Sequence, residues 1–193
     1  MCLFQGGGRG NIFLAKHEPR VQQASLRAQR TYVTLVAFVC DDLEVQRVLP
    51  QVLVVGEKAV TIAQLVTIRA ACPPNMVVVR QKSAWNTEAL TARIVNRLRI
   101  ALEPFVAQRQ PLLIMDTARI HLAPLALRAL SRASMWTVLV PPSMTFLLQP
   151  LDTDIFAFLK AAIQNEYQNA RVATGVASPS IVTLAACVAT GIQ

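Results

Sequence analysis

Two short apolar runs, each ending where the chain has to leave a sheet, constrain the fold of this chain most. Residues 111–116 begin at a proline and continue as Leu, Leu, Ile and Met up to Asp116. Residues 135–140 form a second apolar run that leads directly into Pro141 and Pro142. Such runs are typical of buried strands, and proline cannot continue a ladder of backbone hydrogen bonds. We therefore predict two strands whose following loops meet at one edge of an α/β sheet, where such folds place their sites.

Three segments upstream also have the pattern of strands. Residues 31–40, 48–55 and 76–80 are rich in β-branched and apolar side chains, a composition that favours strands. The first two are expected to pair as an antiparallel hairpin across a turn at residues 41–44. Trp136 lies within the strand predicted at residues 135–140, so we expect it in the core.

Helices are predicted at residues 60–71, 86–103, 122–133, 153–174 and 180–189. In the second of these, Asn86 is placed to cap the first turn. The apolar residues of that helix recur at helical spacing, which predicts one buried face. They are Leu90, Ile94, Val95, Leu98 and Leu102, and the remaining surface carries Arg93, Arg97 and Arg99.

The composition indicates a globular, basic protein with one sizeable core. Of its 193 residues 53% are hydrophobic and 16% are charged, which excludes an intrinsically disordered chain. No stretch reaches the roughly 18 consecutive apolar residues of a membrane span, and the first residues lack the features of a signal peptide. We therefore expect a soluble, intracellular protein with no membrane contact.

The net charge indicates which partners the chain can bind, and the cysteines indicate which sites it can form. Lys and Arg exceed Asp and Glu by 19 to 11, a net charge of +8. Such an excess attracts polyanions, of which nucleic acid is the commonest in cells, although a generic basic surface is an equal alternative. The four cysteines, Cys2, Cys40, Cys72 and Cys187, are too widely spaced for a zinc site or a disulfide framework, so reduced core thiols are expected.

Residues 112–121 (LLIMDTARIH) and 139–160 (LVPPSMTFLLQPLDTDIFAFLK) carry a family resemblance. They are similar to the second half of the catalytic core of the DDE superfamily endonucleases, the pogo/Tigger-like transposases and their domesticated relatives. That family typically has an apolar strand ending in Asp-Asn-Ala-x-x-His, then a Pro-Pro-Asn-x-Thr-x-x-Leu-Gln-Pro-Leu-Asp block. The matching residues are Asp116, Ala118 and His121, then Pro141, Pro142, Thr145, Leu148, Gln149, Pro150, Leu151 and Asp152.

The resemblance extends more weakly over residues 31–171 and implies a fold and a domain organisation. The fold would be an RNase H-like mixed sheet flanked by helices, in which three leading strands form an antiparallel meander and later strands join in parallel. Residues 1–30 would be a loose basic segment, residues 31–175 the endonuclease-like core, and residues 176–193 an apolar helix. The implied partner is DNA, the implied location is the nucleus, and a homo-oligomeric state is left open.

The resemblance also implies a chemistry. Cleavage or joining of phosphodiester bonds by two divalent metal ions requires hard oxygen ligands, which points to Asp116 and Asp152 as catalytic residues and ligands of Mg²⁺ or Mn²⁺. Asp154 is a substitute ligand and Gln149 a residue that shapes the loop. The resemblance implies that His121 orients Asp116 or contacts a phosphate, and the structural alternative is that it caps the following helix or hydrogen-bonds a loop. The structural alternative for Asp152 and Asp154 is capping of the helix expected from residue 153.

The amino-terminal part departs from the family pattern. Family members carry their first catalytic acid on the opening strand, whereas Glu18 is the sole acid before residue 31. Asp41 and Asp42 follow a strand, but the resemblance aligns them with a turn away from the site. We therefore expect the first strand and its acid to be missing, through truncation or decay.

Three functions stay open at this stage. The chain is an endonuclease or transposase core, or it is a degenerate or domesticated copy that only binds nucleic acid. A domain that binds a small anionic ligand is the third alternative, but no Gly-rich loop follows a predicted strand.

Overall fold

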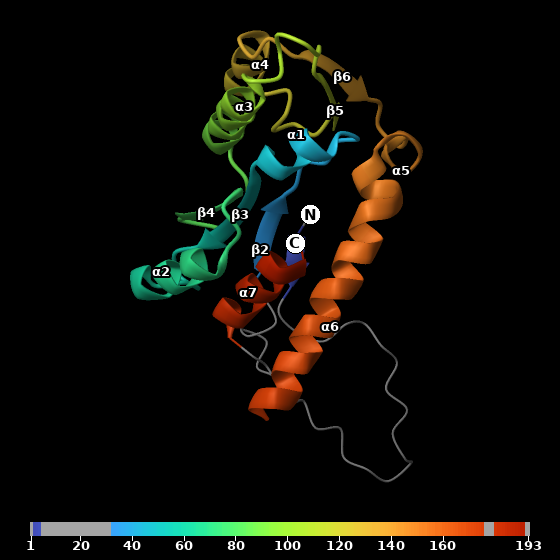
Figure 1. Ribbon diagram of the computed structural model, residues 1–193. Helices are drawn as coiled ribbons and strands as arrows, with labels where there is room; N and C mark the ends of the chain where they lie inside the picture. The colour runs from blue at the N-terminus through green and yellow to red at the C-terminus, as the bar shows by residue number, and fades with distance from the viewer. Residues whose placement is uncertain (1, 5–31, 176–179, 192–193) are drawn as a thin grey trace.

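The computed structural model describes residues 2–4, 32–175 and 180–191, and within them the chain is a mixed α/β fold with two sheets (Figure 1). A four-stranded sheet has the order β1-β2-β3-β4, and a separate two-stranded sheet contains β5 and β6. This architecture is consistent with the RNase H-like fold that we predicted. The strands are β1 (Cys2–Phe4), β2 (Tyr32–Val36), β3 (Gln51–Gly56), β4 (Met76–Gln81), β5 (Leu112–Asp116) and β6 (Trp136–Val140).

The antiparallel pairing of β2 with β3 is confirmed, with Leu35 opposite Leu53, but the predicted turn between them is wrong. Residues Leu43–Val48 form a helix, α1, because the Asp42 carboxylate caps it by accepting hydrogen bonds from the backbone N–H of Glu44 and Val45. An acid at this position satisfies N–H groups that have no partner within the helix.

The predicted meander of three antiparallel leading strands is confirmed, since β1 pairs antiparallel with β2 and β2 pairs antiparallel with β3. β4 runs parallel to β3, because α2 (Ile62–Ala71) returns the chain to the start of the sheet before β4 begins. Parallel strands require such a crossover, and a helix is the usual form. Thr61 begins α2 with a capping box that it shares with Gln64, a signal for a helix start that can be read from sequence.

Helices cover both faces of the four-stranded sheet. On one face Leu35, Leu53 and Val78 pack with α2, α6 (Phe156–Thr174) and α7 (Ile181–Gly191). On the other face Val52 and Val54 pack with Leu90 and Ile94 of α3 (Glu88–Leu102). β3 is buried along its whole length, so it is the centre of the core.

The α3 helix connects the two sheets. All five residues of its predicted apolar face are buried, and they divide into two stripes. Leu90 and Ile94 face β3, whereas Val95, Leu98 and Leu102 pack with α1, β5 and α4 (Pro124–Ser131). The helix is capped by Thr87, which accepts a hydrogen bond from Leu90 N–H, and not by Asn86 as predicted.

The predicted helices near the carboxyl end are present. α5 (Thr145–Leu148) and a π-helical turn (Leu151–Ile155) precede α6, which begins three residues later than expected and ends at Gly175. Gly175 has φ 64°, the left-handed conformation in which glycine commonly ends a helix. In α7 the side chains of Leu184, Ala185 and Val188 belong to the core that includes β2.

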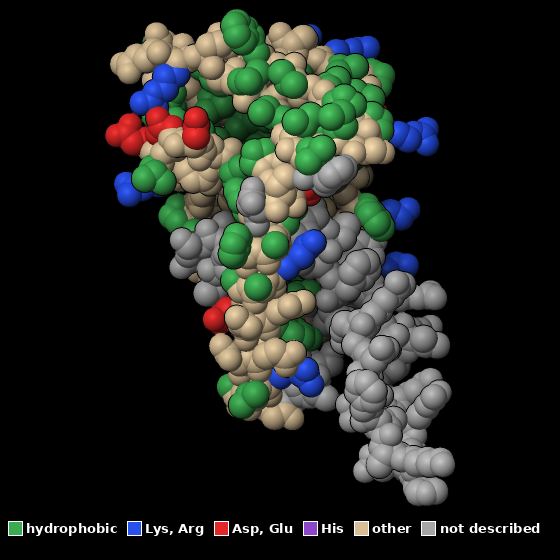
Figure 2. All heavy atoms as spheres, turned by 90° about the vertical axis from the view of Figure 1, so that its right-hand side faces the viewer, with side chains coloured by type: hydrophobic (Ala, Val, Ile, Leu, Met, Phe, Trp, Pro, Cys, Tyr) green, Lys and Arg blue, Asp and Glu red, His purple; other side chains and the backbone are tan. Residues whose placement is uncertain are grey.

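β5 and β6 pair in parallel, as expected, but with each other and not with the four-stranded sheet. Met115 is buried against α3 and α4, whereas Leu112, Ile114, Trp136 and Val138 are exposed. Figure 2 shows hydrophobic side chains over the upper part of this side of the molecule. The prediction that Trp136 is in the core is wrong, since 67% of it is exposed. It alternates onto the side of the strand that no described helix buries.

Cys40, Cys72 and Cys187 are free thiols. Burial raises the pKa of the Cys72 thiol, and burial together with the charge of Glu166 raises the pKa of Cys187. These two groups are therefore held in the unreactive, protonated form. Within residues 2–4, 32–175 and 180–191, no helix combines the length and apolar character needed to cross a bilayer.

Candidate functional site

The edge of the β5–β6 sheet brings two strand ends together. The parallel register places Asp116, the last residue of β5, beside Val140, the last residue of β6. The loops that follow therefore leave from one edge, as predicted. The first loop contains His121, and the second leads through Pro141 and Pro142 to the segment that carries Asp152.

The Asp116 carboxylate is held through one of its two oxygens. Its Oδ1 accepts a hydrogen bond from Ala118 N–H at 3.1 Å and lies 2.6 Å from Nδ1 of His121. Because a carboxylate only accepts, Nδ1 carries the proton and donates it. A second contact of 3.2 Å joins Nδ1 to the backbone oxygen of Asp116. Among the described residues Oδ2 has no hydrogen-bond partner, so this oxygen is available to a ligand.

The site is open to solvent but not fully exposed. The side chain of Asp116 is 36% exposed and that of His121 is 24% exposed. The sequence allowed several roles for His121. In the structure its side chain contacts Asp116. The hydrogen bond from Ala118 N–H was not foreseen. It is a turn closed by an aspartate and the amide two residues on, which is a frequent local pattern for this residue type.

The second loop turns sharply before it reaches Asp152. Ser143 has φ 65°, a left-handed conformation that asparagine, the residue in the family pattern, adopts more readily than most non-glycine residues. Thr145 then begins α5, and its backbone oxygen accepts from Gln149 N–H. The Oε1 atom of Gln149 is buried without a hydrogen-bond partner among the described residues.

Asp152 is exposed, and its carboxylate accepts no hydrogen bond from any described residue. Its backbone N–H donates to Gln149 O at 2.9 Å. Pro150 begins this turn without a side-chain cap, so the alternative of a helix cap does not account for Asp152. The side chain of Asp154 lies outside the described part of the structure.

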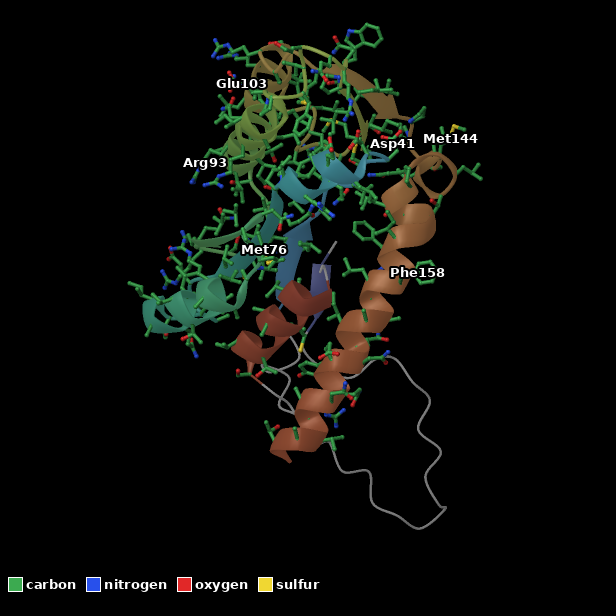
Figure 3. All side chains as sticks on the ribbon, viewed as in Figure 1. Asp41, Met76, Arg93, Glu103, Met144 and Phe158 are labelled. Atoms are coloured by element: carbon green, nitrogen blue, oxygen red, sulfur yellow. The ribbon has the colours of Figure 1, made fainter. Side chains whose placement is uncertain are left out.

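The two other candidate acids have different surroundings. Both carboxylate oxygens of Asp42 are engaged, one in capping α1 and the other in an ion pair with Arg109. Asp41 is exposed on the segment that leads into α1 (Figure 3), and its Oδ1 accepts from the Cys40 thiol at 3.4 Å. The ion pair between Asp42 and Arg109 joins the start of α1 to the segment between α3 and β5, and no sequence signal predicts it.

No group of three or more His, Cys, Asp or Glu side chains among the described residues is close enough to hold an ion. This statement does not extend to Asp154 or to residues 5–31, whose side chains are not described. The free oxygens of Asp116 and Asp152 are nevertheless the hard donors that Mg²⁺ and Mn²⁺ prefer.

Comparison with known proteins agrees with the two motifs. The sequence profile of the DDE superfamily endonuclease family matches residues 33–185, which extends from β2 into α7. Curated proteins and solved structures gave no match. Since the match covers most of the chain, including both strand-end loops, the chain belongs to the DDE superfamily endonuclease family.

Proposed function

We propose that this chain is a transposase-type nuclease domain that binds DNA and cleaves or joins its phosphodiester bonds. In this proposal Asp116 and Asp152 hold a divalent ion, Mg²⁺ or Mn²⁺. The observation that carries it is the state of Asp116, which has one oxygen fixed by His121 and Ala118 and the other without a partner among the described residues. DNA as substrate implies that the protein works in the nucleus.

The donor set suits a catalytic Mg²⁺ or Mn²⁺. Mg²⁺ keeps several waters and is commonly bound by one or two carboxylates together with substrate phosphates. Asp116 and Asp152 meet that requirement for one ion, and a second ion needs a further ligand. When bound, a divalent ion neutralises phosphate charge and supplies an activated oxygen nucleophile. Asp116 contributes a charged oxygen whose direction is already set in the free protein.

The role proposed for His121 is to position Asp116. Its N–H holds Oδ1 at 2.6 Å, which restricts rotation of the carboxylate and directs Oδ2 toward a ligand. Groups that orient metal ligands through hydrogen bonds are typically worth about 10-fold to 100-fold in metal affinity. Substitution of a histidine that only stabilises its own loop would change the metal affinity less than this.

Substitution of His121 tests this role. His121→Ala is expected to weaken Mn²⁺ binding about 10-fold to 100-fold, whereas His121→Asn retains most of the affinity because its amide N–H can replace the ring N–H. The measurement is the loss of the free Mn²⁺ signal in an electron paramagnetic resonance titration. Equal affinities for the parent and His121→Ala, with both folded, would remove His121 from the site.

A second candidate is a module that binds DNA without cleaving it. It is favoured by one observation, namely that no group of three or more His, Cys, Asp or Glu side chains among the described residues is close enough to hold an ion. The basic charge of +8 serves this function equally well.

Nicking of supercoiled plasmid separates the two candidates. Purified protein is incubated with plasmid in Mn²⁺, in Mg²⁺ and in a chelator. The nuclease proposal predicts open-circular product that requires the metal ion. Binding of the plasmid with no metal-dependent product would leave the binding module as the function.

A further inference from the structure

We infer that the exposed arginines of α3 and α4 form a binding site for the phosphate backbone of duplex DNA, apart from the acidic residues at the sheet edge. The inference rests on the proposed function in one respect, that DNA is the substrate. We call the site the helical arginine surface. It consists of Arg93 and Arg97 on α3 and Arg128 and Arg132 at the end of α4, all of them exposed, together with the half-buried Arg99 of α3.

Some described arginines have side-chain partners, whereas others, which include Arg47 and Arg119 as well as the helical arginine surface, have none among the described residues. Four arginines have hydrogen bonds or ion pairs, for example Arg69 with the backbone oxygen of Val78 at 3.0 Å. The others of this group are Arg80, Arg109 and Arg171. By contrast, no residue of the helical arginine surface has a hydrogen bond or ion pair with any described residue. Its positive charges are therefore available to a partner.

The spacing of the arginines within each helix is unfavourable for the stability of the helix unless an anionic partner is bound. Arg93 and Arg97 are four residues apart, as are Arg128 and Arg132. Residues four apart are neighbours on a helix, and like charges there destabilise it. Positions that break a local rule without a gain in the fold are expected at functional sites. An anion that lies along the helix removes this repulsion.

The dimensions fit a nucleic acid backbone. Four residues rise about 6 Å along a helix, which is on the order of the distance between neighbouring phosphates of one strand, so the two guanidinium groups can reach adjacent phosphates. Guanidinium also binds phosphate oxygens in pairs. Arg93 and Arg97 are exposed, and Figure 3 shows Arg93 projecting outward from α3.

Acidic side chains do not neutralise this region. On the same two helices the acid is Glu88, whose Oε1 already accepts a hydrogen bond from Leu125 N–H at 2.7 Å. Glu103 follows α3 at its carboxyl end (Figure 3). The packing of α3 against α4 holds both arginine pairs on one rigid unit, and α4 directly follows the loop of Asp116 and His121.

Charge reversal on α3 tests the site. Binding of a fluorescent 20-base-pair duplex to the full chain is measured by anisotropy at several salt concentrations, without divalent ions. Arg93→Glu/Arg97→Glu is expected to weaken binding by about tenfold or more and to lower the slope of log K against log salt by about 2, since each phosphate contact contributes about 0.9. Lys58→Glu/Lys160→Glu, with the same change of charge on exposed residues elsewhere, is the matched control and should leave the slope unchanged.

Two further measurements make the result decisive. Arg93→Glu alone places an acid four residues before Arg97, a favourable helix pair, so it should unfold no earlier than the parent and still bind DNA more weakly. An unchanged slope for the α3 double variant, an equal loss in the control, or no duplex binding by the parent would overturn the inference. Plasmid nicking is scored separately with the same proteins, so that loss of cleavage with retained binding counts against the nuclease function alone.

Discussion

Replacement of Asp116 by asparagine is expected to abolish metal-dependent nicking, with a loss on the order of 1,000-fold, or about 4 kcal/mol. Asparagine keeps the shape of the side chain, and its oxygen can still accept from His121 and Ala118, the two partners of Oδ1. What it loses is the negative charge on the free oxygen. The expected loss therefore reports metal binding and not a disturbed loop. The measurement is the initial rate of open-circular product from supercoiled plasmid in Mn²⁺.

Asp41→Asn is the matched control for this experiment. Asp41 is an exposed aspartate in the loop before α1, and the same change of charge there should leave the nicking rate within about twofold of the parent. If Asp116→Asn nicks at the parental rate, the activity does not come from this site. If both variants lose activity equally, the effect is one of net charge.

The largest expected loss of stability comes from Leu53→Ala, at about 3–4 kcal/mol of the free energy of unfolding. Leu53 has 0% exposure and lies in the central strand β3, between Leu35 of β2 and Val78 of β4. Truncation leaves a cavity against α2, α6 and α7 that surrounding side chains fill only in part.

Urea denaturation followed by circular dichroism measures this loss, read from the midpoint with an unchanged slope. Leu43→Ala is the control, because Leu43 is 77% exposed at the start of α1 and its loss should cost within about 0.5 kcal/mol. A cost below about 1 kcal/mol for Leu53→Ala would mean that β3 is not the centre of the core.

Local structure was predictable from sequence where the whole pattern lies within one short segment of the chain. The apolar runs at residues 112–116 and 136–140, and the five-residue apolar face of α3, follow from side-chain alternation and helical spacing, and the structure contains all of them. The Thr87 cap was missed by one position, because Asn86 and Thr87 are both good capping residues.

The arrangement of these elements was less predictable, because it depends on contacts between distant segments. The separation of β5 and β6 from the larger sheet cannot be read from the composition of the strands. Trp136 shows the same limit, since strand alternation assigns it to one side of β6 but does not say which side a helix will bury.

For the candidate site, the sequence indicated which residues belong to it, and the structure showed which of their atoms are in contact. The motif pointed to Asp116 and His121 but left several roles open for the histidine. The 2.6 Å contact between their side chains depends on the turn made at Ala118, which local spacing alone does not determine. Asp152 likewise had a capping alternative, which the absence of any hydrogen bond to its carboxylate among the described residues does not support.

The central claim is that Asp116 and Asp152 bind the same divalent ion. A Mn²⁺ titration by electron paramagnetic resonance on the parent, Asp116→Asn, Asp152→Asn and the double variant tests it most directly. Sharing of one ion predicts that each single substitution raises the Kd at least about tenfold, and that the double variant is much less affected than the product of the two effects, since residues that act on one ligand are not additive. A Kd for Asp152→Asn equal to that of the parent would contradict the claim.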